Sequence, residues 1–361
     1  MMNGKHTLAV FSLLATAIFI ILWLKNSTYL PNVKNNGFKR KWIENLVVLE
    51  KEKNISSAFA RFPGTHSGYN FLATKDPFVL VKFSEDLNPK DTFTLNLPKI
   101  NASYNPNILV VDSFNVLVAL PNSALSFTIS LDSEKIDSVR LQSDIFTRFS
   151  KMRNSSAIVR ALTKDQTRQS FKKIDLKSGE VIKEASIVEN DKSYMGFDSD
   201  GILQFDPIRN LFIYVQYYRN EVHCFDTSLN LIYKSNTIDT ISTNSAVYTK
   251  LEKFDSQKVT SSAARLIVNR ECIVDSKNGV YFILSNLRSD DATNSDFREN
   301  NTLDIYKIDD GMYLGSFTIP KRNSTYFLSA TIDSSHLLVL NKGNLAKYRI
   351  DYSKLLQIMA K

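Results

Sequence analysis

The stretch "DPIRNLFIYVQYYRNEVHCFDTSLNLIYK", from Asp206 to Lys234, contains apolar and aromatic runs separated by turn-forming residues at short intervals. It divides into the strands "LFIYVQYY", "EVHCFD" and "LIYK", joined by the turns "RN" and "TSLN". A further strand, "GILQF", precedes it and is separated from it by "DPIRN". Turn signals at intervals of roughly eight to ten residues predict a meander of four short antiparallel strands.

The aspartate that ends the third strand of this unit recurs along the chain. Asp closes tight turns because its side chain bonds backbone N–H groups a few residues on. Most of the recurrences are about 40 to 50 residues apart, the length of a four-stranded propeller blade. The equivalent positions are Asp86, Asp132, Asp175, Asp226, Asp309 and Asp351, with extra material in the fifth unit. The sequence therefore predicts an all-β, six-bladed β-propeller of four-stranded antiparallel blades.

The sixth unit lacks an evident fourth strand. It contains "YFLSATID", "HLLVLN" and "LAKYRID", and the following "SKLLQIMAK" suits a strand or a short helix. A strand-like run, "NLVVLEKEK" at residues 45–53, has no partner early in the chain. Because open sheet edges favour aggregation, we expect this run to close the ring as the outer strand of the last blade. A β-sandwich or two smaller β-domains are the alternatives.

An uncharged stretch, "TLAVFSLLATAIFIILWL" from Thr7 to Leu24, predicts one transmembrane helix before the propeller. As a helix it would extend roughly 27 Å, close to the thickness of a bilayer core. A cleaved signal peptide is the alternative, but "LWLKNSTYL" lacks small residues at the cleavage positions. We expect an anchor at 1–25, with the lipid bilayer as its partner through Thr7–Leu24, a juxtamembrane linker at 26–44 and the propeller at 45–361.

The side of the membrane on which the propeller lies is indicated less directly. Basic residues after the span, from Lys25 to Lys41, outnumber those before it, and the positive-inside rule then favours a cytoplasmic domain. A short tail before one apolar span is nevertheless the usual layout of an export anchor, and large domains cross largely regardless of charge. We expect an exported, periplasmic propeller, with cytoplasmic retention as the alternative.

The segment "DGILQFDPIRNLFIYVQYYRNEVHCFDTSLNLIYKSNTIDT", residues 200–240, resembles the most distinctive part of an uncharacterised family of bacterial, membrane-anchored, propeller-like proteins. The likeness extends loosely from the N-terminal anchor to about Asp310, and the first unit departs from the family pattern. This resemblance implies a six-bladed β-propeller and membrane anchoring, and it implies no functional residue.

Strand parity separates two faces of such a propeller. With the strands named A to D from the axis outward, the B–C and D–A connections lie on one face, and the A–B and C–D turns on the other. Both long insertions, residues 241–268 and Arg288–Asn301, fall on the first, here called the insertion face; the other is the tight-turn face. Long loops on a rigid scaffold commonly bind partners, although insertions are also tolerated without a role. The predicted binding residues are Tyr217, Tyr218, Arg219, Arg288, Asp290, Asp291, Asp296 and Arg298.

The predicted closing strand begins on the tight-turn face, so we expect the chain to enter the propeller there. The basic run "FKRK", Phe38–Lys41, would then lie between this face and the bilayer, as a headgroup contact or a solvated linker. The insertion face would look away from the membrane.

Reactive side chains are few. No histidine stands at metal-binding spacing from another ligand, so we predict no metal site and no cofactor. Cys224 and Cys272 fall on strands too far apart for a disulfide, and we predict two unpaired, buried thiols. The net charge of +8 is dispersed and no nucleic-acid-binding motif is present, so we expect no nucleic-acid partner.

These patterns favour a protein- or ligand-binding or scaffolding module over an enzyme, with a protein partner on the insertion face. Tyr217, Tyr218 and Arg219 would supply an aromatic and cationic anchor for that partner. The alternative is a hydrolase or lyase with its active site in the axial channel, which requires polar groups converging from the A strands.

Overall fold

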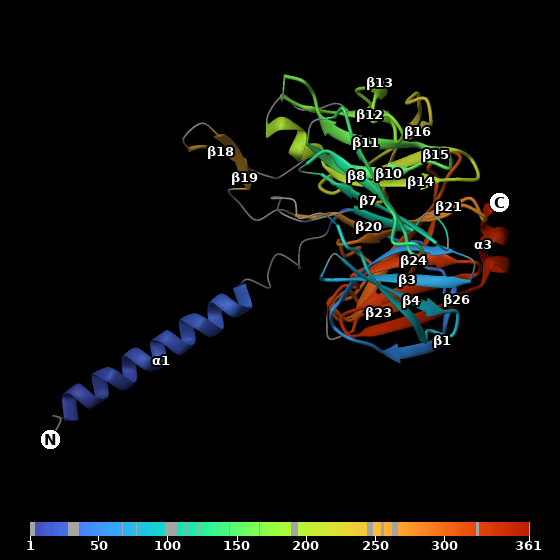
Figure 1. Cartoon of the computed structure of the whole chain (residues 1–361). Coiled ribbons are helices and arrows are strands. Elements are labelled where there is room, and N and C mark those ends of the chain that lie inside the picture. Colours follow the sequence, from blue (N-terminus) through green and yellow to red (C-terminus); the bar gives the residue numbers. More distant parts are fainter. Residues whose placement is uncertain are drawn as a thin grey trace.

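The computed structural model describes residues 4–27, 36–97, 107–188, 194–243, 248–253, 256–261 and 266–360, apart from residues 67, 77, 111, 113, 122, 144, 166, 323 and 324. Six four-stranded antiparallel sheets are arranged around one axis as the blades of a β-propeller (Figure 1). The predicted fold class, all-β with six four-stranded antiparallel blades, is confirmed.

In each blade, strand A lines the axis and strand D lies at the outer edge. In the order A to D, blades 1 to 3 are β2 (Phe59–His66), β3 (Tyr69–Thr74), β4 (Val79–Ser84) and β5 (Pro89–Thr94); β6 (Asn107–Val110), β7 (Asn115–Leu120), β8 (Leu125–Ser130) and β9 (Ile136–Arg140); and β10 (Phe146–Lys151), β11 (Ser156–Leu162), β12 (Gln169–Asp175) and β13 (Val181–Ala185). Blades 4 to 6 are β14 (Gly201–Asp206), β15 (Leu211–Gln216), β16 (Glu221–Asp226) and β17 (Leu231–Asn236); β20 (Asn269–Asp275), β21 (Val280–Ser285), β22 (Asn300–Lys307) and β23 (Tyr313–Pro320); and β24 (Ser329–Asp333), β25 (His336–Asn341), β26 (Asn344–Ile350) and β1 (Val47–Asn54).

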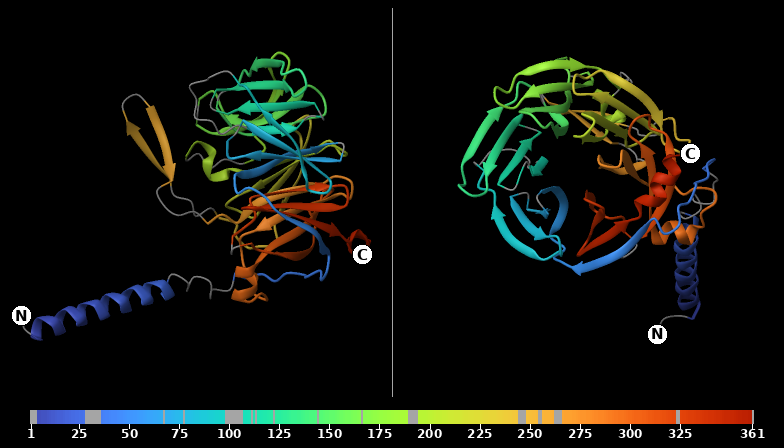
Figure 2. Two further views of the ribbon diagram at one scale, coloured as in Figure 1. Left: turned by 60° about the horizontal axis from the view of Figure 1, so that its bottom comes forward. Right: turned by 90° about the vertical axis from the view of Figure 1, so that its right-hand side faces the viewer.

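The N-terminal strand β1 closes the ring as strand D of blade 6. It pairs antiparallel with β26, from Val47 opposite Ile350 to Asn54 opposite Asn344. The inner strands of neighbouring blades contact one another around the axis, as β2 does with β6 and β24, and β14 with β10 and β20 (Figure 2). The closing strand expected at residues 45–53 is thus observed, and it covers an edge of β26 that would otherwise be open to pairing.

The apolar core is distributed between neighbouring blades. Strands B and C are covered on both faces, which is why "LFIYVQ" of β15 and "VYFILS" of β21 are nearly continuous apolar runs. Phe225 links blades 3 and 4, with its ring centroid 5.4 Å from that of Phe212 and 5.0 Å from that of Phe171. The outer strands are less covered, and Leu231 and Ile232 of β17 are exposed.

Aspartates hold the turns of the tight-turn face. Asp226 accepts hydrogen bonds from the backbone N–H groups of Ser228 at 2.8 Å and Asn230 at 2.9 Å. Asp175 makes the same kind of turn in blade 3. In blade 6 the equivalent Asp351 caps helix α3 (Tyr352–Met359) instead, so the C-terminal segment takes the helical form of the two expected.

Both long insertions are on the insertion face, as strand parity predicts (Figure 2). The D–A connection after blade 4 contains a hairpin of β18 (Tyr248–Lys253) and β19 (Ser256–Ser261). The B–C loop of blade 5 contains helix α2 (Asn294–Glu299). A short 3-10 segment, η2 (Tyr194–Ser199), leads into β14 from the same face.

The N-terminal stretch forms helix α1 (Gly4–Ser27), with side chains described for residues 12–23. Among the described residues, no helix is both long and apolar enough to be a candidate membrane span. Anchoring through Thr7–Leu24 stays a prediction.

Candidate functional site

Residues 36–46, here called the strap, cross blade 5 before the chain enters β1. Phe38 is buried against Leu287 on the insertion face. The middle of the strap exchanges two backbone hydrogen bonds of 2.8 Å with Ser316 of the outer strand β23. The last carbonyl of the strap accepts from the backbone N–H of Asp351 on the tight-turn face. The strap therefore carries the chain from the insertion face to the tight-turn face.

Arg40 fixes the strap to the interior of blade 5. Its Nε and Nη2 donate to the two carboxylate oxygens of Asp304 at 2.7 and 3.0 Å, and Nη2 also donates to Ser285 Oγ at 2.8 Å. Burial lowers the pKa of Arg40, but the Asp304 carboxylate beside it raises the pKa above its ordinary value. The interpretation of this basic run as a headgroup contact or a solvated linker is wrong for Arg40, whose side chain is 1% exposed.

Two predicted binding residues, Asp290 and Asp291, hold the strap in place. Asp290 accepts from the backbone N–H groups of Asn36 at 2.7 Å and Gly37 at 3.1 Å. Asp291 accepts from Trp42 Nε1 at 2.7 Å. These carboxylates therefore have partners within the chain, which sequence analysis missed because Asn36 and Asp290 are 254 residues apart.

The other predicted residues of this loop are Arg288, Asp296 and Arg298. Arg288 Nη1 donates to the carbonyl of Ala292 at 2.6 Å. Asp296 accepts from the hydroxyl of Thr293, also at 2.6 Å, as part of the N-terminal cap of α2. Arg298 lies exposed in the last turn of α2. Arg288 and Asp296 thus order the loop itself.

The strap also corrects the expected point at which the chain enters the propeller. Because Asn36 and Gly37 are bound to Asp290 on the insertion face, the strap begins on that face. The expectation that the chain enters on the tight-turn face is wrong. β1 does begin there, as expected, but the strap first crosses the edge of blade 5.

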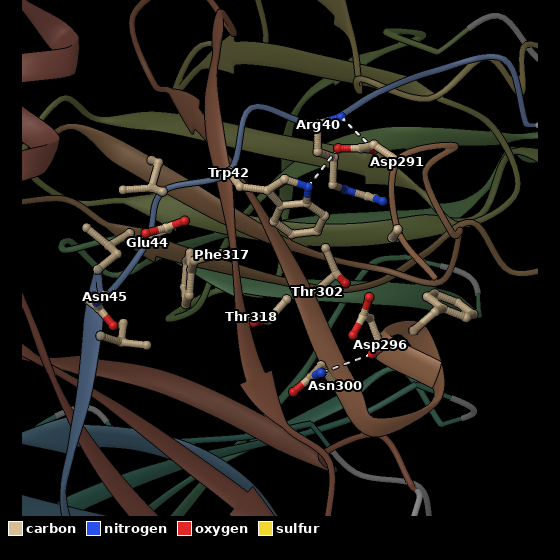
Figure 3. Close-up of a pocket in the computed structure, with 15 residues that line it drawn as sticks. Arg40, Trp42, Glu44, Asn45, Asp291, Asp296, Asn300, Thr302, Phe317 and Thr318 are labelled. Carbon is tan, nitrogen blue, oxygen red and sulfur yellow. Dashed lines mark hydrogen bonds between the residues drawn. The ribbon is translucent and has the colours of Figure 1, made fainter. Parts of the chain in front are cut away.

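A groove of about 440 Å³ opens between the strap, α2 and blade 5, and we call it the rim groove (Figure 3). Trp42, which is 37% exposed, lines it together with Phe297 and Phe317. Glu44 and Asp296 add carboxylates to the lining. Aromatic side chains surrounded by polar groups are typical of protein-binding surfaces.

The remaining predicted residues lie apart from this loop, in the B–C connection of blade 4. Tyr217 lines the axial channel, Tyr218 is buried, and Arg219 Nη2 lies 3.6 Å from the carboxylate of Asp198. Burial raises the pKa of Tyr217, and the positive charge of Arg148 offsets part of that rise. The structure therefore divides the predicted residues between two places, the mouth of the channel and the loop that holds the strap.

The axial channel is a cavity of about 700 Å³ lined by all six A strands. Its charged lining residues are Arg61, Arg148 and Glu271, which were not among the predicted site residues. Arg148 Nη2 donates to Asp200 at 2.6 Å, and burial raises the pKa of Glu271 to about 7. The described lining contains one carboxylate and no histidine. Among the described residues, no group of three or more His, Cys, Asp or Glu side chains is placed to hold a metal ion.

A sequence signal exists for two of the missed residues. "FARF" at Phe59–Phe62 and "FTRF" at Phe146–Phe149 share the pattern F-x-R-F, and each begins an inner strand. A search for short motifs at strand starts therefore points to Arg61 and Arg148. Trp42 carries no such signal, because its position depends on contacts with a loop far along the chain.

The fold and its cavities define the chain as a six-bladed β-propeller with an open axial channel. It is similar to a member of the DUF4221 family from Bacteroides vulgatus, with 14% identity over 86% of this chain and 99% of that chain, at a TM-score of 0.57. It is also similar to virginiamycin B lyase from Staphylococcus aureus (10% identity over 84% of this chain and 100% of that chain, TM-score 0.49) and to BamB from Moraxella catarrhalis (9% over 84% and 100%, TM-score 0.44).

At these identities the likeness concerns the fold alone. No family model matches the chain, and no curated protein matches it in sequence. Of the family expected from the sequence, the propeller fold is confirmed; the bacterial origin and the membrane anchor stay predictions.

Proposed function

We propose that the chain is a single-pass membrane protein, anchored through Thr7–Leu24, whose exported, periplasmic propeller binds a protein held in the same membrane. Support for the anchor is the uncharged stretch within α1 (Gly4–Ser27). Support for the binding role is the rim groove, which combines three aromatic side chains with a polar surround.

The observation that carries this proposal is the bond between Asp290 and the strap. Asp290 holds Asn36 and Gly37 on the insertion face, and eight residues, 28–35, separate α1 from Asn36. A chain extends at most about 3.6 Å per residue, so the insertion face lies within roughly 30 Å of the end of the anchor. This proximity supports a partner held in the same membrane.

The orientation is tested by energy transfer from a single tryptophan to a headgroup-labelled lipid. The chain has two tryptophans, so Trp23→Phe leaves Trp42 beside the rim groove as the only donor. The matched control, Trp23→Phe with Trp42→Phe and Leu356→Trp, places the donor on exposed α3 of the tight-turn face. We expect stronger transfer from Trp42. Equal transfer from both positions, or stronger transfer from position 356, contradicts the proposed orientation.

The partner site is tested in native membranes with a photo-crosslinking residue at Phe297 in the groove, and with the same residue at Leu356 as control. We expect a discrete crosslinked protein from position 297 that is absent from position 356 and is lost when Trp42→Ala is added. A crosslink that is indifferent to Trp42→Ala, or no crosslink from position 297, overturns the groove as the docking site.

The alternative, a hydrolase or lyase in the axial channel, has less support. General acid–base or metal-assisted chemistry requires converging titratable groups. The described channel lining offers Glu271 without a second carboxylate or a histidine. Binding therefore accounts better for the described residues than catalysis does.

A further inference from the structure

Three of the six inner strands share an irregularity that the other three lack. In β2, β10 and β20, the first and third residues of the strand pair with consecutive residues of strand B, so the second residue is an extra one. The extra residues are Ala60 in β2, Thr147 in β10 and Arg270 in β20. The described pairs of β6, β14 and β24 with their B strands run without any shift in register. Blades 1, 3 and 5 thus each have a β-bulge at the start of the inner strand.

The residue that follows each of these bulges is charged and lines the axial channel. These residues are Arg61 in blade 1, Arg148 in blade 3 and Glu271 in blade 5, and they are the charged residues of the described lining. Their partners on strand B are Ala73, Arg160 and Leu284, each within two residues of the end of strand B on the insertion face. The three charged residues therefore lie at one level, near the opening of the channel on the insertion face. Bulges re-aim side chains and are common beside binding sites.

Opposite charges line the channel from alternate blades, Arg61 and Arg148 from blades 1 and 3 and Glu271 from blade 5. Blades 1 and 3 flank blade 2, and blade 5 lies across the axis from blade 2 (Figure 2). Asp200 is shared between Arg148, at 2.6 Å, and Arg160, at 3.2 Å, so two guanidinium groups are matched by one carboxylate. Arg61 adds a further positive charge on this side of the channel.

Glu271 supplies the negative charge on the far side. Among the described residues, its carboxylate accepts one hydrogen bond, from the backbone N–H of Cys272 at 3.2 Å. Tyr217 also lines the channel, and its ring lies 5.2 Å from the Arg148 guanidinium. A partly desolvated carboxylate with so few partners is a suitable site for a cation.

We propose that the axial channel binds a small ligand with an anionic group at one end and an ammonium group at the other, entering from the insertion face. The anionic group, a carboxylate or a phosphate, pairs with Arg61, because guanidinium groups bind such oxygens well. The charge of Arg148 adds to the attraction, although its Nε, Nη1 and Nη2 already donate to the Gly201 carbonyl, the Thr147 carbonyl and Asp200. The ammonium group pairs with Glu271. Short unblocked peptides and aminoalkyl phosphates have this chemistry. The site is independent of the rim groove and of the membrane partner.

Calorimetry on the full chain in detergent, at pH 7.5, tests the proposal with probes of defined charge. The first series is unblocked alanine peptides of two to four residues, which carry a carboxylate and an ammonium group. The best-binding length is compared with its N-acetyl form, which lacks the ammonium, and with its C-terminal amide, which lacks the carboxylate. O-phosphoethanolamine tests the phosphate form of the same chemistry.

We expect either the unblocked peptide or phosphoethanolamine to bind, with at least about tenfold loss for a probe that lacks one of the charges, as expected for a charge-assisted hydrogen bond. Glu271→Gln should lower the affinity for the unblocked peptide to that of its N-acetyl form and leave the N-acetyl form unaffected. Arg61→Gln should weaken both forms about equally.

Several outcomes overturn the proposal. They are equal binding of the N-acetyl and unblocked peptides, an unchanged preference in Glu271→Gln, and binding of none of the probes. Because Arg148 also holds Asp200, the arginine side is tested through Arg61, and near-ultraviolet circular dichroism checks that each variant is folded. Failure here leaves the rim groove result unaffected, since Trp42 is not among the lining residues of the channel.

Discussion

The guanidinium of Arg40 and the carboxylate of Asp304 form a bidentate ion pair inside blade 5, with N–O distances of 2.7 and 3.0 Å. Removing one member of a buried pair leaves the other charge without compensation, which costs about 3–5 kcal/mol. We therefore expect Arg40→Met to lower the free energy of unfolding by about that amount, measured by chemical denaturation. Arg40→Met combined with Asp304→Leu should recover most of the loss, because neither charge then remains buried.

The control for the Arg40 prediction is an exposed pair of the same type. Lys135 and Asp137 lie 3.2 Å apart with side chains 71% and 65% exposed, and such pairs contribute about 0–1 kcal/mol. Lys135→Met should therefore change stability little. A cost for Arg40→Met no greater than that for Lys135→Met contradicts a structural role for the strap.

Glu271 should make the propeller less stable as the pH rises. Burial raises the pKa of Glu271 from 4.5 to about 7. Between these values the folded state binds a proton that the unfolded state has released, so stability falls as pH increases through this range. The loss is at most about 3 kcal/mol by pH 8.

Glu271→Gln should therefore be more stable than the wild type at pH 8 and nearly equal to it at pH 5, as measured by thermal unfolding across the pH range. Glu85→Gln, on a side chain that is 70% exposed, is the matched control. The same difference between Glu271→Gln and the wild type at both pH values would show that the Glu271 carboxylate does not titrate near neutral pH.

The two cysteines should be unreactive in the folded protein. Cys224 and Cys272 are unpaired and buried, as predicted from the sequence. Burial raises the pKa of Cys224 to about 11 and raises that of Cys272 well above its ordinary value, so neither forms the reactive thiolate at pH 8. A thiol titration at pH 8 should detect no free thiol in the native state and two after denaturation. Rapid labelling of either cysteine in the native state would contradict the register of β16 or β20.

Gly201, the first residue of β14, should not tolerate a side chain. A Cβ atom there would lie 2.2 Å from the carbonyl oxygen of Val215 and 2.9 Å from Cζ of Tyr214. Overpacking of this kind costs about 1–3 kcal/mol or more, so Gly201→Ala should lower the unfolding midpoint clearly. Gly343→Ala is the comparison, because its nearest neighbour is 3.8 Å away and only its positive φ causes strain. An effect of Gly201→Ala smaller than that of Gly343→Ala would contradict the close approach of β14 to β15.

Much of the propeller could be predicted because its signals are local. The aspartates at the C–D turns, such as Asp175 and Asp226, bond backbone groups within four residues, so their spacing along the chain records the blade repeat. The long apolar strands B and C reflect burial by blades on both sides, and that burial is visible in composition. The face that carries the insertions followed from strand parity alone.

The candidate sites were harder to predict because they depend on contacts between distant segments. The sequence predicts Asp290 and Asp291 as polar binding residues in a loop. In the fold they bind the strap, which is more than 240 residues away along the sequence. The prediction of the face on which the chain enters was wrong for the same reason. The composition of the basic run does not indicate that Arg40 is buried. Arg61, Arg148 and Glu271 lie on three different blades, and only closure of the ring brings them to one level of one channel.

The sequence alone determined the number of blades, the free thiols and the face of the insertions, because each depends on patterns within one strand, one turn or one repeat. It also determined the closing strand, because one strand-like run was left over and the last unit lacked one. The tertiary structure decided which face the strap meets, which carboxylates are already paired, and which charges line the axis. Those features depend on the packing of blades, which leaves no periodic signal in the chain, and on bulges that shift a side chain by one residue, for which the shared F-x-R-F pattern of β2 and β10 is a partial signal.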